Sequence, residues 1–173
     1  MHTNTALIAT AERLFHEHGF MATGMDALAR AAGMSSRTLY KHAGSKTDLI
    51  VAVLDARDRR FFELVDGPRV AALFAAHEAW IAAEGAHGCL FLRALGETGG
   101  AEPAIAAAVL RHKERLRDCI GCMVQAEIGK DDPVLAQQVL LLFEGAVAAS
   151  AWQGLDAVAG AARTAAQLVA GAR

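Results

Sequence analysis

The spacing of apolar residues along the chain predicts helices and no strands. Residues 5–18 carry Leu7, Ile8, Ala11, Leu14 and Phe15 at intervals of three and four, which is the pattern of an amphipathic helix. Similar intervals, bounded by glycine and proline, place further helices at 25–32, 36–42, 46–65, 68–84, 89–96, 103–127, 133–153 and 155–170. Because no segment alternates like a half-buried strand, we expect an all-α protein.

The second and third helices are joined by a short turn. Gly33 follows an apolar helix end, where glycine accepts a left-handed backbone, and Ser35 or Ser36 can cap the next helix. That helix has one apolar anchor, Leu39. Its other side chains are polar or cationic: Ser36, Arg37, Thr38, Tyr40, Lys41 and His42. A helix–turn–helix places such a helix in the DNA major groove.

Two further helix starts have capping signals. Thr23 to Asp26 has the form of a capping box, in which Thr23 covers a free amide and Asp26 reaches back. Ser45 can cap the fourth helix, and Lys46 follows in its first turn, where a cation opposes the helix dipole. The charged middle of this helix, residues 55–60, is expected to face water.

These residues resemble the TetR-type transcriptional regulators. The resemblance lies in Ala32-Gly33-x-Ser35, Thr38-Leu39-Tyr40-x-His42 and Ser45-Lys46-x-x-Leu49, in the order and at the spacing of that family. It covers about the first fifty residues. Two positions depart from the family pattern: Gly24 replaces a hydroxyl residue, and Ala43 replaces an aromatic residue after the histidine.

The resemblance implies two functional parts. They are a three-helix, helix-turn-helix DNA-binding head at residues 1–46 and a helical effector-binding and dimerisation domain at 47–173. Arg37 is the candidate for bidentate reading of guanine, and Lys46 is the candidate for a phosphate contact. The full set of expected DNA-binding residues is Thr23, Ser36, Arg37, Thr38, Tyr40, Lys41, His42 and Lys46.

Composition and charge narrow the function further. The chain is 54% hydrophobic with 3 prolines and a net charge of −2, which argues against sequence-independent coating of DNA but allows a local basic face. Neither a signal peptide nor a membrane span is expected, because Gln137, Gln138 and Glu144 interrupt the most apolar stretch. The 3 cysteines fit a reducing compartment, and we expect a cytoplasmic protein.

The last two predicted helices are apolar on more than one side. Leu140, Leu141 and Trp152 extend the apolar surface beyond the face that one core can bury. The pattern predicts a homodimer through these two helices, and the family resemblance implies the same. Such a dimer would place two heads on a pseudo-palindromic double-stranded DNA operator.

The resemblance also implies an effector pocket among the body helices. The candidate ligand-binding residues are His77, Trp80, Arg93, Phe143 and Glu144. The predicted function is therefore transcriptional regulation, with a repressor that an unknown small molecule releases from its operator. No cofactor and no metal site are predicted.

Other classes of function have weaker signals. The sequence has no nucleophile elbow and no phosphate-binding loop, so an enzyme is not expected. Cys119 and Cys122 have a C-x-x-C spacing inside a helix, which leaves open a redox- or metal-responsive regulator. A structural DNA binder without sequence specificity would need a broader basic surface.

Overall fold

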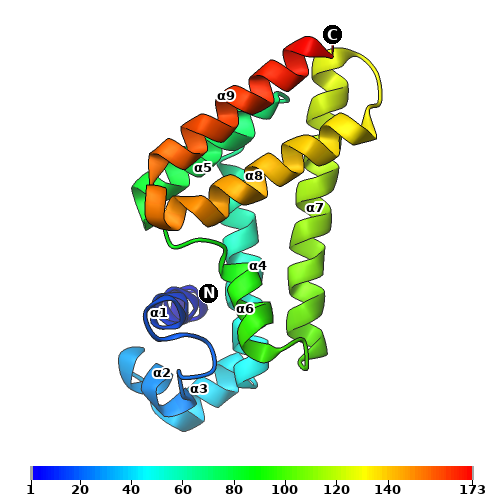
Figure 1. The fold of residues 1–173 in the computed structure, drawn as a ribbon. Coiled ribbons are helices and arrows are strands. Elements are labelled where there is room, and N and C mark those ends of the chain that lie inside the picture. Colours follow the sequence, from blue (N-terminus) through cyan, green and yellow to red (C-terminus); the bar gives the residue numbers. More distant parts are fainter. Residues whose placement is uncertain (1, 173) are drawn as a thin grey trace. The chain divides into compact units, whose positions relative to one another are not determined.

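The computed structural model describes residues 2–172 and confirms an all-α protein (Figure 1). These residues form nine helices and no strand: α1 (His2–His18), α2 (Met25–Ala31), α3 (Ser36–Ala43), α4 (Lys46–Glu63), α5 (Val70–Glu84), α6 (Leu90–Thr98), α7 (Pro103–Ile128), α8 (Pro133–Gln153) and α9 (Leu155–Gly171). The predicted start of α5 at Pro68 is wrong, because Arg69 has an extended backbone and forms the N-cap.

The described chain packs into two compact units. The amino-terminal unit comprises the residues up to Asp58 together with Leu90–Arg111. The carboxy-terminal unit comprises Arg59–Cys89 together with the residues from His112 onward. Helices α4 and α7 therefore contribute to both units. The expected functional boundary between residues 46 and 47 concerns activity, and it stays a prediction.

The core of the amino-terminal unit contains the predicted face of α1. Leu7, Ala11, Leu14 and Phe15 are buried, and the Phe15 ring lies 4.8 Å from the ring of Phe20. Phe20 thus folds back onto α1 after the helix ends, as its position after Gly19 suggests. This packing gives α2 and α3 a fixed base.

Arg57 contradicts the expectation that residues 55–60 face water. Its side chain is 7% exposed, and its guanidinium donates from Nη1 to Glu12 Oε1 over 2.7 Å. The same nitrogen lies 3.0 Å from His16 Nε2. Arg57 follows Val53 and Leu54 on the buried face of α4, and a buried charge is tolerated when it is paired.

The carboxy-terminal unit is held mainly by apolar packing. Helices α5, α8 and α9 lie against one another in Figure 1, and Phe61, Phe74, Trp80 and Phe143 belong to their shared core. The inner face of α8 includes Leu135, Val139, Phe143 and Ala146.

The outer face of α8 is also apolar. Val134, Leu141 and Trp152 are 67%, 63% and 72% exposed. By length and composition alone α8 could cross a membrane, with 28% of its most apolar window buried within the described chain. A single helix of this kind is weak evidence for a membrane span, since a core helix of a soluble protein passes the same test of length and composition.

Candidate nucleic-acid interface

The turn between α2 and α3 is fixed by two backbone hydrogen bonds. Gly33 has a φ of +65°, and its N–H donates to the Arg30 carbonyl over 3.1 Å. The Met34 N–H donates to the Ala29 carbonyl over 3.0 Å. These two bonds form a Schellman motif, in which the glycine adopts the left-handed backbone that the sequence predicts.

The start of α3 is capped by Ser35. Its hydroxyl oxygen accepts the Thr38 N–H over 3.1 Å and lies 2.8 Å from the Thr38 hydroxyl. Ser36, the other candidate for the cap, donates instead to Asp26 Oδ1 of α2 over 2.9 Å. The cap and the link to α2 together fix where α3 begins.

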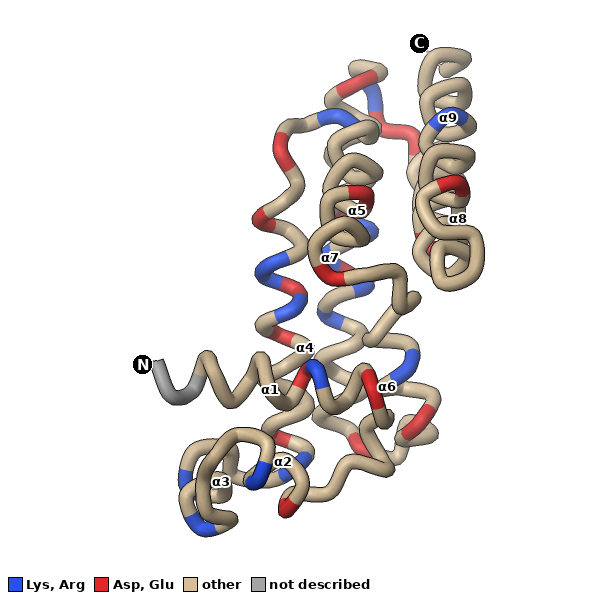
Figure 2. Tube along the Cα trace, turned by 90° about the vertical axis from the view of Figure 1, so that its left-hand side faces the viewer, with Lys and Arg blue, Asp and Glu red and all other residues tan. Residues whose placement is uncertain are grey.

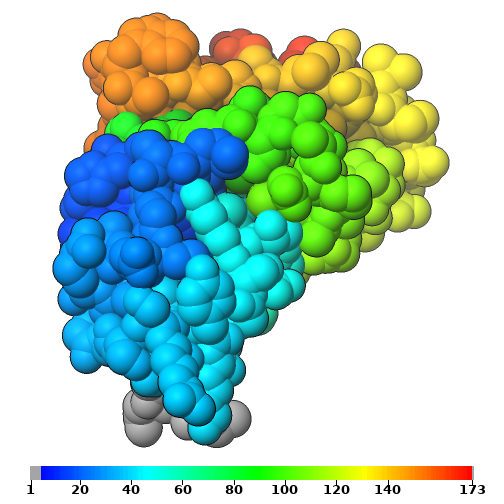
Figure 3. Space-filling view, turned by 90° about the horizontal axis from the view of Figure 1, so that it is seen from below, coloured from blue at the N-terminus to red at the C-terminus, as the bar shows by residue number. Residues whose placement is uncertain are grey.

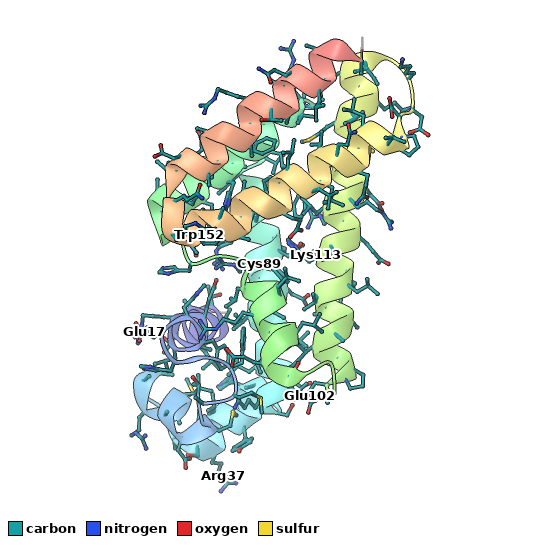
Figure 4. The ribbon with its side chains drawn as sticks, in the orientation of Figure 1. Glu17, Arg37, Cys89, Glu102, Lys113 and Trp152 are labelled. Atoms are coloured by element: carbon teal, nitrogen blue, oxygen red, sulfur yellow. The ribbon has the colours of Figure 1, made fainter. Side chains whose placement is uncertain are left out.

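Helix α3 exposes nearly all of its side chains. Leu39 is its buried residue, with 0% exposure, while Arg37, Tyr40, Lys41 and His42 are exposed. The Arg37 side chain points away from the helices in Figure 4. Figure 2 shows Lys and Arg along α3 and no acidic residue within it. In the space-filling view of Figure 3, the light-blue atoms of the α2–α3 segment lie at the surface.

The start of α4 combines a reciprocal cap with a cation. The Ser45 hydroxyl oxygen accepts the Asp48 N–H over 3.0 Å, which confirms the predicted cap. The Asp48 carboxylate accepts the Ser45 hydroxyl and N–H over 2.7 and 2.9 Å, and these bonds lower the pKa of Asp48. Lys46 donates from Nζ to the Met21 carbonyl over 3.1 Å, which leaves two of its three ammonium hydrogens for another acceptor.

The capping box predicted at Thr23 is wrong. The N-cap of α2 is Gly24, without a side-chain bond, and Asp26 accepts from Ser36. The Thr23 side chain is 3% exposed, and its hydroxyl donates to the Gly19 carbonyl over 2.6 Å. Thr23 precedes the N-cap of α2 by one residue, and its hydrogen bond to Gly19 stabilises the turn that follows α1. Its role as a DNA contact stays a prediction.

Helix α6 braces the turn between α1 and α2. The Glu97 carboxylate accepts the Met21 N–H over 3.0 Å and Arg93 Nε over 2.8 Å. Burial of Glu97 favours its neutral form, but the hydrogen bonds from Met21, Arg93 and Phe20 outweigh burial and lower its pKa. This contact was not predicted, since no local pattern links residues so far apart in the sequence.

The five predicted ligand-binding residues occupy three places. His77, Trp80 and Phe143 belong to one aromatic cluster in the carboxy-terminal unit, with the rings of His77 and Phe143 5.6 Å apart. Glu144 binds Lys113 Nζ over 2.6 and 2.8 Å. Arg93 lies in the amino-terminal unit, where it also donates to the His16 carbonyl over 2.9 Å. Their shared role in effector binding stays a prediction.

One of the cysteines, Cys89, lies beside a charged side chain. Figure 4 shows Cys89 and Lys113, whose Sγ and Nζ atoms are 3.5 Å apart. Within residues 2–172 the structure brings together no group of three or more His, Cys, Asp or Glu side chains that could hold a metal ion.

Known proteins match both the sequence and the fold of this chain. The sequence profile of bacterial regulatory proteins of the tetR family matches residues 7–53. The helix–turn–helix transcriptional activator FasR of Mycolicibacterium smegmatis is 42% identical over 65 residues, which cover 38% of this chain. The match spans 28% of the length of that curated relative.

Solved structures match nearly the whole chain. A TetR-family transcriptional regulator from Streptomyces coelicolor is 28% identical, with a TM-score of 0.80 over 94% of this chain and 95% of the other. A TetR-type regulator from Streptomyces avermitilis is 29% identical, with a TM-score of 0.79 over 98% and 97%. The profile match contains the turn and all of α3, so the amino-terminal part of this chain is similar to the tetR family of bacterial regulatory proteins, and the whole chain shares the fold of solved TetR-type regulators.

Proposed function

We propose that this protein is a DNA-binding transcriptional regulator that inserts α3 into the major groove of its operator. The observation that carries the proposal is the exposed cationic face of α3, which rests on the single buried residue Leu39. The Schellman turn at Gly33 and the Ser35 cap fix the helix at its start. A helix held so firmly with so little of its surface buried is suited to present side chains to a rigid partner.

The proposed contacts divide by chemistry. Arg37 has the planar donor pair that reads guanine, and it lies in the first turn of α3, where a recognition helix meets base edges. Tyr40, Lys41 and Lys46 carry donors suited to phosphates, which fix the position of the protein without reading sequence. Ser36, Thr38, His42 and Thr23 complete the proposed set.

The proposed active form is a homodimer through α8 and α9. Leu141 and Trp152 expose large apolar side chains on α8, and Leu155 at the start of α9 is 50% exposed. A second copy would cover this surface, and a two-fold dimer binds two half-sites of a pseudo-palindromic operator. Because its target is the bacterial chromosome, the protein is proposed to act in the cytoplasm.

Effector release would follow from thermodynamic linkage. A small molecule that binds more tightly to a form of the protein unsuited to the operator lowers the affinity for DNA. Bound DNA lowers the affinity for the small molecule by the same factor. The proposed effector residues are His77, Trp80, Phe143 and Glu144, with Arg93 bracing the turn before α2. Repression is typical of the family, whereas the curated relative FasR is described as an activator.

The experiment is a fluorescence anisotropy titration of the purified protein on DNA flanking its own gene, across a salt series. The wild type is expected to prefer this DNA to a scrambled duplex. Arg37→Ala is expected to lose about 1–3 kcal/mol of that preference, and Lys46→Ala to reduce the salt slope by about one unit. Arg69→Ala and Lys130→Ala, which remove exposed cations from other turns, are the matched controls.

Two results would contradict this function. Equal affinity for both duplexes, unchanged by Arg37→Ala, would indicate a structural DNA binder instead. Equal losses in Arg69→Ala and Arg37→Ala would show that net charge alone governs binding. A transcription assay from the same promoter then separates repression from activation.

A further inference from the structure

Two thiols of α7 line one groove of the carboxy-terminal unit. Cys119 and Cys122 are three residues apart on the helix, and both border a groove of about 360 Å³. The other residues of the groove wall are Phe62, Val65, Gly67, Pro68, Arg115 and Met123. The groove therefore joins a pair of thiols to an apolar surface, and none of the predicted effector residues lines it.

The two thiols are free and differ in exposure. Cys122 is exposed and Cys119 is half-buried. Side chains three residues apart on a helix have Cβ atoms about 5–6 Å apart, which one atom bonded to both sulfurs can span. A shared ligand can therefore bridge the pair without unwinding the helix.

The environment of Cys119 keeps it a thiol at neutral pH. Burial raises the pKa of Cys119, the neighbouring Cys122 raises it further, and Arg115 opposes both. The raised pKa lowers the thiolate fraction of Cys119 at neutral pH, which slows its reaction with alkylating agents and peroxides. Chemistry that condenses with both thiols and releases water fits the pair better.

The number of ligands restricts what the pair can bind. In the described part of the chain, no third His, Cys, Asp or Glu side chain joins Cys119 and Cys122 in a metal-binding group. Ions that need three or four protein ligands therefore lack enough ligands at this site. Thiol sulfur prefers soft metal and metalloid centres. A soft centre with only two exchangeable positions matches the site.

We propose that Cys119 and Cys122 form a binding site for trivalent organoarsenicals, R–As(OH)₂. Two As–O bonds break and two As–S bonds form, and each thiol proton leaves with a hydroxide as water. Arsenic stays trivalent, so the step needs neither an oxidant nor a reductant. This inference concerns a site outside the proposed DNA interface and stands whether or not the protein binds an operator.

The groove supplies the second half of the recognition. The third bond of the arsenic is to carbon, and this bond is not exchanged when the two thiols bind. The group R therefore stays on the arsenic and is directed along the groove. Phe62, Val65 and Met123 offer an apolar surface for R, and the Arg115 guanidinium lies 4.0 Å from the centre of the Phe62 ring. An aromatic R can pack against this wall, and inorganic arsenite cannot.

The test uses the full reduced chain with one equivalent of phenylarsine oxide, followed by excess 2-mercaptoethanol and intact-protein mass spectrometry. The wild type is expected to keep one adduct, which a dithiol such as 2,3-dimercaptopropanol removes. Cys119→Ser and Cys122→Ser are each expected to lose retention at least about tenfold, while Cys89→Ser keeps it. Arsenite is expected to bind the wild type at least about tenfold more weakly.

The outcomes separate the two parts of the proposal. An adduct that survives the monothiol equally well in either serine variant, or that depends on Cys89, overturns the dithiol site. Arsenite binding as tight as that of phenylarsine oxide overturns the role of the groove. Circular dichroism checks that each variant is folded, and Cys119→Ala and Cys122→Ala replace any serine variant that is not.

Discussion

The two compact units both have apolar cores, but different contacts are prominent beside those cores. In the amino-terminal unit, directional bonds set the geometry: Arg57 with Glu12, Glu97 with Met21, and Ser45 with Asp48. In the carboxy-terminal unit, packed rings are more prominent, including Phe74 against Phe143 at 5.5 Å, and the Lys113–Glu144 ion pair lies beside them. This difference in contacts parallels a difference in exposed surface, which is cationic on α3 and apolar on α8.

A surface that reads DNA has to place single polar atoms, and hydrogen bonds fix position and direction at modest cost in buried area. A surface that meets a second copy has to exclude water over a large area, and apolar contact provides that without precise direction. The roles proposed for the exposed cations of α3 and for the exposed apolar residues of α8 follow this division. Substitutions confined to one unit test this division.

Glu12→Gln tests the directional bonds of the amino-terminal unit. The change removes the carboxylate from a buried guanidinium, since the Glu12 and Arg57 side chains are 7% and 8% exposed. Losing one partner of a buried ion pair costs about 3–5 kcal/mol of unfolding free energy, measured by urea denaturation.

Glu17→Gln is the matched control for Glu12→Gln. It breaks the exposed Arg13–Glu17 pair of the same helix and should cost less than about 0.5 kcal/mol. Equal losses in the two variants would show that the buried pair does not anchor α1 to α4.

Leu141→Lys with Trp152→Lys tests the apolar surface of the carboxy-terminal unit. If this face forms the proposed dimer interface, two ammonium groups on it will weaken the dimer at least about 100-fold, or about 2.7 kcal/mol, as measured by analytical ultracentrifugation. Leu110→Lys changes a residue that is 58% exposed in the amino-terminal unit and should leave the dimer intact. A double variant that dimerises as the wild type does would exclude α8 from the interface.

What the sequence predicted well has a local cause. Gly33 and Ser45 act on residues within three or four positions, so their identities alone indicate a helix end and a helix start. All nine described helices begin within about three residues of the expected positions for the same reason.

What the sequence did not predict depends on distant partners. Arg57 lies among charged neighbours and looks exposed, and its partner Glu12 is 45 positions away. Glu97 and Met21 are 76 positions apart. The Thr23 error was local, because the N-cap of α2 is Gly24, which has no side chain to form a capping box.

Ser35→Ala tests whether the cap of α3 supports the polar surface. Losing the acceptor for the Thr38 N–H should cost about 1 kcal/mol of unfolding free energy and weaken operator binding by a similar amount. Ser36→Ala removes a hydroxyl from the adjacent residue without removing the cap, so it should cost less. If Ser36→Ala costs more than Ser35→Ala, the link to Asp26 rather than the cap positions α3.

Glu97→Gln tests the brace on the turn before α2, and its effect should depend on pH. Because hydrogen bonds lower the pKa of Glu97 below its ordinary value of 4.5, its charge stabilises the fold above that value. The stabilisation is lost as the pH falls through the lowered pKa and the carboxylate is protonated in both states. Urea denaturation should therefore show wild type and Glu97→Gln differing by about 0.5–1 kcal/mol at pH 7 and converging below pH of about 4. Glu114→Gln, on an exposed part of α7, gives the change that any lost carboxylate causes. A difference for Glu97→Gln that grows toward low pH would mean that burial, rather than hydrogen bonding, governs this carboxylate.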